Sequence, residues 1–112
     1  MAGWFEIDKS TNDKFKFVLK AGNGEIILSS QMYEAKSGAQ NGIESVQVNS
    51  QQEAQFAKEI STNDKPYFNL VAANHQIIGT SQMYSSTSAR DNGIRSVMEN
   101  GNSDDIRDLT LS

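Results

Sequence analysis

A fixed internal spacing constrains this chain more than any other feature of its sequence. The letters SQMY stand at Ser30–Tyr33 and return at Ser81–Tyr84, an offset of 81 − 30 = 51 residues. With the same offset, NGIESV at 41–46 becomes NGIRSV at 92–97, and the two copies align without a gap. Roughly half of the paired positions are identical. The chain is therefore a tandem duplication, and the unit it folds into must pack against a second copy of itself.

The duplication divides the 112 residues into two repeats and a remainder. We expect repeat one over residues 4–50, repeat two over 55–101 and a closing C-terminal strand over 104–112, all within a single compact domain spanning 1–112. A chain of this length buries about two thirds of the surface that it exposes when unfolded, which is enough for one modest core.

The charge and composition argue against several kinds of partner and chemistry. The net charge is −4 and no basic stripe is present, so binding to nucleic acid or to an anionic membrane surface is disfavoured. The chain has no cysteine, which excludes disulfides, thiolate catalysis and zinc–thiolate sites. It also lacks an apolar run of the roughly 18 residues that a membrane span needs, and it lacks the pattern of a signal peptide. These features predict a cytoplasmic protein that binds no cofactor.

Alternating hydrophobicity predicts three strands at the start of each repeat. KFKFVLKA, at 14–21, alternates apolar and polar side chains, and the apolar positions recur in repeat two. A shorter strand, WFEIDK at 4–9, precedes it. EIILSS, at 25–30, follows the pair Asn23-Gly24, which is typical of a type I′ hairpin turn. The strands are therefore expected to be antiparallel, with one buried face.

A helix is expected to follow the strands, over roughly 37–49 in repeat one and 88–100 in repeat two. The residues that agree between the copies fall on one broad helical stripe, as in a helix that packs on a sheet. Glycine inside a helix costs about 1 kcal/mol relative to alanine, so the repeated Gly42 and Gly93 indicate a close approach of the helix to the sheet. Two pairs have the spacing of a capping box at the helix start, the second less clearly: Ser37 with Gln40, and Ser88 with Asp91.

These motifs resemble the YegP family of small bacterial proteins. KFKFVLKAGNGEIILSSQMY followed by KSGAQNGIESVQVN matches that family's strand, Asn-Gly turn, SSxxY and NGIxSV patterns, and the resemblance covers nearly the whole chain. It implies an α+β fold in which two β-β-β-α-β units form one antiparallel sheet with helices packed on it. The C-terminal strands, FAKEIST at 56–62 and IRDLTLS at 106–112, would be exchanged between the units.

The resemblance also implies a quaternary state, because members with one unit would pair as homodimers. A tandem member would then be a monomer that folds as its own pseudo-dimer. The family is functionally uncharacterised, so the resemblance supplies a fold and no chemistry. Repeat two departs from repeat one at four framework positions, which puts in doubt only the equivalence of the two faces: Pro66 for Phe15, His75 for Gly24, Gly79 for Leu28 and Arg90 for Ala39.

The repeated SQMY motif is the first candidate site. It lies where the third strand leads into the helix. We expect Met32 and Tyr33 to pack under the helix start, because methionine fills irregular gaps. The alternative is a pair of symmetry-related polar and aromatic pockets beside Asn41 and Asn92. The residues that would form them are Ser30, Gln31 and Tyr33 in repeat one and Ser81, Gln82 and Tyr84 in repeat two.

Three other polar features are expected to be structural. His75, the single histidine, lies in a predicted exposed turn, without the nucleophile and orienting group that a catalytic base needs. The STNDK turns, at 10–14 and 61–65, carry one aspartate each, too few oxygens for a metal site. We therefore assign no catalytic or metal-binding residue. An acidic patch near the last strand is interpreted as solvated charge that protects a sheet edge: Asp104, Asp105 and Asp108.

The outer face of the second strand is the remaining surface of interest. It is expected to be solvent-exposed, with the alternative that it binds a partner protein, because its residues are mixed in polarity and differ between the copies. They are Lys16, Val18 and Lys20 in repeat one, and Tyr67, Asn69 and Val71 in repeat two.

Three functions follow from these features. The repeated residues are almost entirely structural in kind, which favours a small non-enzymatic binding or interaction protein of unknown ligand and partner. The second is a small enzyme with a site at the junction of the repeats, which would need tyrosines or carboxylates with strongly shifted pKa values in a shared cleft. The third is a weak single-stranded nucleic-acid binder, with Tyr67 as a stacking platform on the open sheet face.

Overall fold

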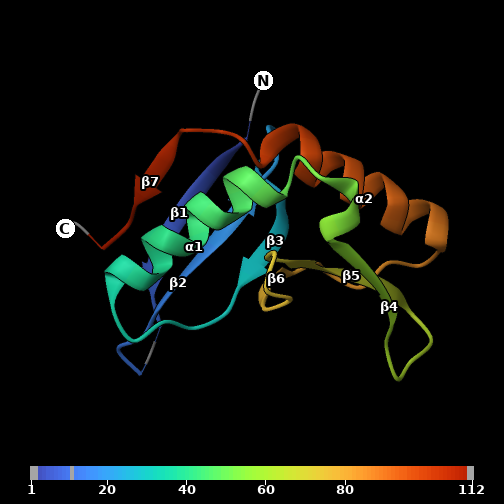
Figure 1. Cartoon of the computed structure of the whole chain (residues 1–112), viewed down its shortest axis with the longest axis horizontal. Helices are drawn as coiled ribbons and strands as arrows, with labels where there is room; N and C mark the ends of the chain where they lie inside the picture. The colour runs from blue at the N-terminus through green and yellow to red at the C-terminus, as the bar shows by residue number, and fades with distance from the viewer. Residues whose placement is uncertain (1–2, 11, 111–112) are drawn as a thin grey trace.

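The computed structural model describes residues 3–10 and 12–110, and its elements follow the duplication (Figure 1). Repeat one contains β1 (Trp4–Lys9), β2 (Phe15–Lys20), β3 (Ile26–Ser30) and α1 (Lys36–Asn49). A short 3₁₀ helix, η1 (Glu53–Gln55), leads to repeat two, which contains β4 (Phe56–Ile60), β5 (Pro66–Val71), β6 (Ile77–Thr80) and α2 (Thr87–Asn100). The chain closes with β7 (Ile106–Asp108). Position 11 of the first STNDK turn and positions 111–112 of the expected closing strand lie outside the described residues.

All seven strands form one sheet, in the order β4-β5-β6-β3-β2-β1-β7. The strands β1 to β6 pair in an antiparallel manner, as predicted. β7 instead lies parallel to β1, with Phe5 opposite Ile106. The reason is the route of the chain after α2. The Ser103 hydroxyl donates to the Gly3 carbonyl at 2.7 Å, so β7 and β1 start at the same end of the sheet.

Each strand that follows a helix completes the part of the sheet that belongs to the other repeat. β4, after α1, pairs with β5, and β7, after α2, pairs with β1. The two crossings are not equivalent, because β4 also occupies the position in repeat two that β1 occupies in repeat one. The sheet is therefore mixed, and the counterparts β1 and β4 differ: β1 is covered by β7, and β4 is a terminal strand.

Both helices lie on the same face of the sheet, a point that the sequence leaves open (Figure 1). α1 contacts β5 and β6 as well as β2, and α2 contacts β2 and β3 as well as β5. Each helix therefore packs on strands of both repeats, and the two repeats share one core. That core consists of fifteen buried apolar residues: Phe5, Ile7, Phe17, Leu19, Ile27, Leu28, Ala39, Ile43, Val46, Phe56, Phe68, Leu70, Ile78, Ile94 and Val97.

The starts of the helices differ from the predicted capping boxes. α1 begins after Ala35, which provides no side-chain cap, and α2 begins after Ser86, whose hydroxyl accepts from the Ala89 N–H at 3.1 Å. Ser37 and Ser88 thus lie inside the first turn. Gly38 also lies in the first turn of α1, where an added Cβ would come within 3.1 Å of the Tyr33 ring.

The hairpin turns also differ from the predicted type I′. Gly24 has a φ of 86°, and its N–H donates to the Ala21 carbonyl at 2.8 Å. Asn23 is not among the described residues with positive φ, so the Asn-Gly pair contributes one left-handed residue rather than two. His75 holds the equivalent position in repeat two with a φ of 68°, and it is exposed as predicted.

Candidate functional site

The serine side chains of the SQMY motifs bond backbone groups of the neighbouring strands. Ser30 Oγ accepts from the Phe17 N–H at 2.8 Å, and Ser81 Oγ accepts from the Phe68 N–H at 3.0 Å. Each hydroxyl also donates to the carbonyl of the next residue, at 2.7 Å for Ser30 and 2.8 Å for Ser81. These hydroxyls are therefore part of the framework, as expected for polar groups that bond loop backbone.

The tyrosines of the motif pack between the sheet and the helix. The ring of Tyr33 stacks on that of Phe17, with centroids 6.3 Å apart and planes 14° apart. A Cβ added to Gly42 would lie 2.5 Å from the Tyr33 hydroxyl oxygen, so the glycine makes room for the tyrosine. Gly93 does the same for Tyr84. The repeated helix glycine thus permits a close tyrosine as well as a close sheet.

Met32 does not pack under the helix, contrary to the prediction. Its side chain is 53% exposed. The extended backbone here bridges Phe15 to Tyr33, which turns Tyr33 toward the core and its neighbour Met32 away from it.

A pocket lies at the junction of the two repeats, beside the first SQMY motif. It has a volume of about 540 Å³. Gln31 and Tyr33 line it from the motif, and Asn41 lines it from α1, so the structure brings these three predicted residues together. The opposite wall comes from the β5–β6 hairpin of repeat two and includes Asn74 and Gln76. The remaining lining residues are Gly38, Gly42, Ser45, Ala72, Ile77 and Ile78.

The wall from repeat two could not be predicted from the sequence. It depends on the pairing of β3 with β6, which places the second hairpin against the first helix, and no local pattern specifies that pairing. The chemistry of the pocket is neutral, because its polar lining consists of amides and the hydroxyls of Tyr33 and Ser45. Burial raises the pKa of the Tyr33 phenol, which therefore stays protonated and can donate a hydrogen bond.

Tyr84, the counterpart of Tyr33, lies near a carboxylate, that of Glu25. Burial raises the pKa of Tyr84, a hydrogen bond with Gln82 opposes that shift, and the negative charge of Glu25 raises the pKa further. Glu25 is the counterpart of Gln76, since 76 − 51 = 25. The two tyrosines therefore share a framework, while the first hairpin presents a carboxylate and the second an amide.

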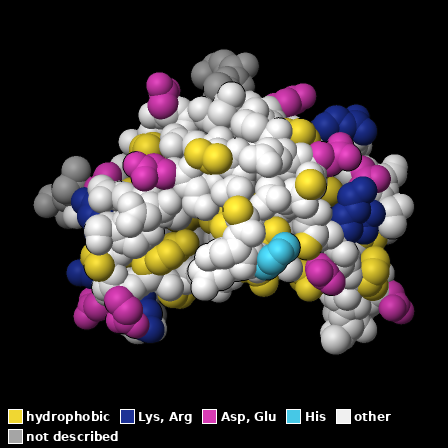
Figure 2. Space-filling model, viewed as in Figure 1, with side chains coloured by type: hydrophobic (Ala, Val, Ile, Leu, Met, Phe, Trp, Pro, Cys, Tyr) yellow, Lys and Arg dark blue, Asp and Glu magenta, His cyan; other side chains and the backbone are white. Residues whose placement is uncertain are grey.

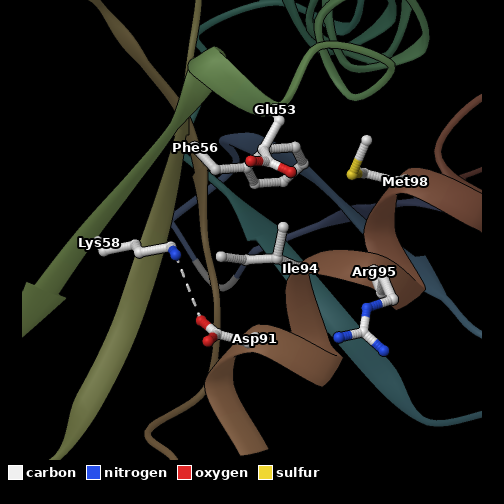
Figure 3. Close-up of a pocket in the computed structure, with 7 residues that line it drawn as sticks. All are labelled: Glu53, Phe56, Lys58, Asp91, Ile94, Arg95 and Met98. Carbon is white, nitrogen blue, oxygen red and sulfur yellow. Dashed lines mark ion pairs between the residues drawn. The ribbon is translucent and has the colours of Figure 1, made fainter. Parts of the chain in front are cut away.

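A second hollow lies between β4 and α2, and we call it the β4–α2 groove (Figure 3). Its volume is about 190 Å³. Phe56, Ile94 and Met98 give it an apolar floor. Its rim is charged: the Lys58 ammonium lies 3.5 Å from the Asp91 carboxylate, and both side chains are about half exposed. Glu53 and Arg95 complete the lining.

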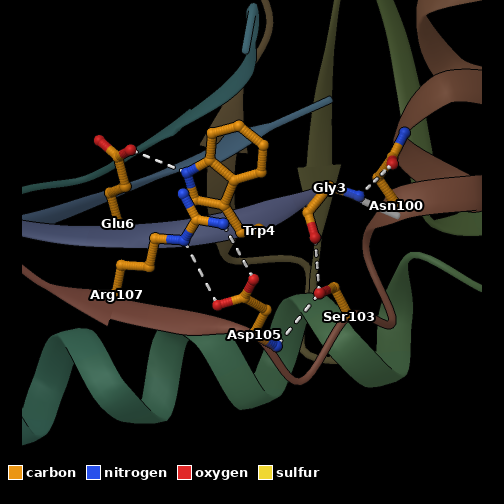
Figure 4. Close-up of polar contacts among 7 residues, drawn as sticks. All are labelled: Gly3, Trp4, Glu6, Asn100, Ser103, Asp105 and Arg107. Carbon is orange, nitrogen blue, oxygen red and sulfur yellow. Dashed lines mark hydrogen bonds and ion pairs between the residues drawn. The ribbon is translucent and has the colours of Figure 1, made fainter. Parts of the chain in front are cut away.

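The acidic patch near the last strand is paired rather than simply solvated. Asp105 forms an ion pair with Arg107 at 3.2 Å, and the Arg107 guanidinium lies 4.0 Å over the ring of Trp4 (Figure 4). Asp108 pairs with Lys36 at the start of α1. The prediction missed these pairs because Lys36 is distant from Asp108 in the sequence, while Arg107 meets Asp105 only through the local course of the chain into β7. Asp104 is exposed, as expected.

The same contacts shift two pKa values. A hydrogen bond from Lys36, aided by Thr110, lowers the pKa of Asp108. A hydrogen bond from the Trp4 indole, at 2.8 Å, lowers the pKa of Glu6. Lys20 lowers the pKa of Glu6 further, and partial burial opposes the shift.

The outer face of β2 has a shallow hollow of about 130 Å³, lined in part by Lys16, Val18 and Lys20. An ion pair between Lys20 and Glu6, at 3.2 Å, crosses it. Within residues 3–10 and 12–110, no cluster of three metal-ligating side chains is present. In the same part of the chain, no helix has the length and apolar character needed to cross a membrane.

Comparison with known proteins decides the family. The profile of a family described as "Domain of unknown function (DUF1508)" matches the chain twice, at residues 10–56 and 61–108. The chain belongs to the YegP (UPF0339) family. A "UPF0339 protein" of Shewanella oneidensis is 74% identical over 110 residues, which cover 98% of this chain and 100% of the relative. "UPF0339 protein YegP" of Escherichia coli K12 is 56% identical, with coverage of 98% and 100%.

Two solved structures agree with the fold. The solution NMR structure of a UPF0339 protein from Shewanella oneidensis has a TM-score of 0.92 and 73% identity, and the match covers 97% of this chain and 92% of that chain. The solution NMR structure of YegP from E. coli has a TM-score of 0.93 and 55% identity, with coverage of 97% and 94%. The family and the duplicated α+β fold are thereby confirmed. The relatives are uncharacterised proteins, and their names state no activity.

Proposed function

We propose that this protein is a non-enzymatic binding protein whose ligand site is the junction pocket. The observation that carries the proposal is the convergence of Gln31, Tyr33 and Asn41 with the Asn74–Gln76 turn of the other repeat around about 540 Å³. Small-molecule sites in proteins have volumes of roughly 300–1,000 Å³ and combine an apolar floor with a few polar groups. A site shared by both repeats also gives the duplication a use, since neither repeat supplies both walls.

The lining chemistry selects the ligand class. Amides both donate and accept hydrogen bonds, and the neutral Tyr33 phenol adds a further donor. Ile77 and Ile78 offer an apolar surface to a flat face. An uncharged polar small molecule with hydrogen-bonding groups along one edge, such as a sugar or a nucleoside, fits this lining better than an ion.

The alternative of an enzyme at the same junction is less well supported. A general base needs a group that is ionised or readily protonated near neutral pH. The described residues that line the pocket include no carboxylate and no histidine, and the raised pKa of Tyr33 favours its neutral form. Weak binding of single-stranded nucleic acid, a cytoplasmic location and a monomeric state stay predictions.

The test is an amide-resolved NMR titration with four defined probes: a disaccharide, a nucleoside, its 5′-monophosphate and a dicarboxylate. We expect saturable shifts at Gln31, Asn41 and Gln76 with a neutral probe and none with the dicarboxylate. Asn41→Ala removes a polar group of the pocket and is expected to weaken binding about tenfold, the effect of one lost hydrogen bond.

Asn92→Ala is the matched control, because Asn92 has the same helical position in repeat two and does not line this pocket. It is expected to leave binding within twofold. The proposal fails if no neutral probe shifts the pocket amides, or if both variants lose binding equally. Chemical conversion of a bound probe would favour the enzyme instead.

A further inference from the structure

The strands β1 and β4 are counterparts in the two repeats, yet only β1 is covered by a further strand. β1 pairs with β2, and β4 with β5, in the same register: Phe5 lies opposite Leu19, and Phe56 lies opposite Leu70. β7 covers β1, whereas β4 is the last strand on its side of the sheet in the described part of the chain. An uncovered edge presents unpaired N–H and C=O groups to any extended chain.

β7 shows how such an edge is filled. The Phe5 N–H donates to the Asp105 carbonyl at 2.9 Å, and the Leu109 N–H donates to the Ile7 carbonyl at 2.9 Å. Alternate residues of β7 thus turn their backbone groups toward β1. The backbone groups of Asp108 therefore point away from β1. The register of β4 on β5 is the same, so the Phe56 carbonyl and the N–H and carbonyl of Lys58 face the open edge. The Phe56 N–H faces the same way, but it is already bonded to the Glu53 carbonyl at the end of η1.

The side chains of β7 form a short pattern of apolar and acidic residues. Ile106 lies opposite Phe5, and Asp108 lies opposite Ile7. The Asp108 carboxylate then pairs with Lys36 of α1, which fixes the far end of the strand. The covered edge therefore accepts the pattern apolar-x-acidic, in a direction parallel to β1.

The β4–α2 groove lies beside β4 (Figure 3), as β7 lies beside β1 in repeat one. In repeat one, the Gln47 side chain donates to the Ser103 carbonyl at 2.8 Å as the chain enters β7. Met98 is the counterpart of Gln47 and lines the groove with Phe56 and Ile94. The apolar floor is thus open where an apolar residue opposite Phe56 would lie.

In repeat one the cation that pairs with the acidic residue of β7 lies on the helix, whereas in repeat two the available cation lies on strand β4. Thr87 replaces Lys36, and Lys58 replaces Ile7, the residue that lies opposite Asp108. Asp91 lies 3.5 Å from Lys58 and 3.3 Å from the Arg90 guanidinium, so one carboxylate is shared by two cations. With Arg95 and Glu53, the rim carries two cations and two anions, and the buried Arg90 adds a positive charge beside Asp91, although the whole chain has a net charge of −4. Figure 2 shows basic and acidic side chains gathered together on the side where Figure 1 shows α2.

We propose that the β4 edge and the β4–α2 groove bind an extended peptide segment of a partner protein, parallel to β4, with the pattern apolar-x-acidic. The backbone of the segment extends the sheet, its apolar residue fills the groove over Phe56, and its acidic residue meets Lys58. This site is separate from the junction pocket, so each proposal stands or fails without the other.

The test uses a capped peptide with the sequence of residues 102–110, NSDDIRDLT, added to the full-length labelled protein. We expect saturable amide shifts at 56–60 of β4 and 91–98 of α2. N-methylation of the peptide at Leu109 removes a hydrogen bond to the strand edge and is expected to weaken binding about tenfold. N-methylation at Asp108, whose N–H points away from the edge, is the matched control and is expected to change affinity less than twofold.

Charge reversal tests the acidic position. Lys58→Glu is expected to weaken binding about threefold to fivefold, as for an exposed ion pair, and a peptide with Asp108→Lys is expected to recover that loss on the variant. Lys65→Glu, on the β4–β5 turn outside the groove, is expected to have no effect.

Four outcomes overturn the proposal. One is the absence of shifts at millimolar peptide. Another is shifts on β1, which would mean that the peptide only displaces β7. Equal effects of the two N-methylations would exclude strand pairing. Concentration-dependent shifts on β4 without peptide would mean that a second copy of this chain fills the edge.

Discussion

Two pairs of counterpart residues differ in size at places where the two repeats contact each other. Leu28 and Gly79 are counterparts, and a Cβ added to Gly79 would come within 2.9 Å of Leu28 Cγ. Ser50 and Gly101 are counterparts as well, and a Cβ on Gly101 would lie 2.6 Å from that of Ser50. Residues near a two-fold axis meet their own copies, so a symmetric dimer has to fit the same side chain twice. A tandem chain can place a larger residue against a glycine instead.

The Leu28 and Gly79 pair therefore predicts compensation. Gly79→Leu overfills a buried site and is expected to lower the free energy of unfolding by about 1–3 kcal/mol. Leu28→Gly leaves a cavity and is expected to cost more than that. The double variant restores the total volume and is expected to be more stable than the sum of the two losses implies. Urea unfolding of the three variants measures this, and strictly additive losses would contradict it.

The sequence shows that positions 28 and 79 differ but not that they touch. Internal comparison identifies departures from the repeat, and only the pairing of β3 with β6 turns a departure into a contact. The same limit applies to the junction pocket. Gln31, Tyr33 and Asn41 were predictable because they recur, whereas Asn74 and Gln76 depend on the three-dimensional approach of the second hairpin.

At the scale of elements, periodicity and turn signals predicted the six antiparallel strands and both helices. The clearest patterns are the alternating buried residues of β2 and β5 and the single buried stripe of each helix. β7 is different, since it has three residues and its Ile106 is about half exposed. Its direction is set by the loop after α2 and by polar contacts, among them Asn100 with the Gly3 N–H at 2.7 Å. A strand held by its ends in this way has no hydrophobic pattern from which its direction could be predicted.

The acidic groups around β7 lead us to expect that β7 separates from β1 at low pH. The pKa values of Asp108 and Glu6 are both lowered in the folded protein. Ionisation of these groups therefore stabilises the fold at pH values above their unfolded pKa of about 4, and this stabilisation is lost as the pH falls through the lower folded values. We expect the protection factor of the Leu109 amide to decline below about pH 4 before those of β2 and β5.

Asp108→Asn provides the control for this prediction. It removes the ionised group, so the Leu109 protection factor is expected to be low already at neutral pH and to change little on acidification. A simultaneous decline of protection in β7, β2 and β5 would show that these carboxylates report global unfolding instead.

At the scale of the whole molecule, the two repeats share one core. The core is continuous across the repeats, and each helix packs on strands of both. The sequence predicted the duplicated α+β fold through its repeat and its resemblance to the YegP family. It did not predict that both helices share one face, because the hydrophobic stripe of a helix shows that it packs on a sheet and not on which side.

Because the core is shared, a destabilising substitution in repeat two is expected to lower the stability of repeat one as well. Leu70 is fully buried in β5, and Leu70→Ala is expected to lower the free energy of unfolding by about 2–5 kcal/mol. Trp4, the single tryptophan, lies in β1 and reports on repeat one. Its fluorescence and the far-ultraviolet circular dichroism are expected to shift to lower urea together, with a single midpoint. Leu19→Ala, at the counterpart position, is expected to produce a similar shift. If Trp4 kept the wild-type midpoint in Leu70→Ala while the dichroism split into two transitions, the repeats would be independent, and the shared core would not couple them.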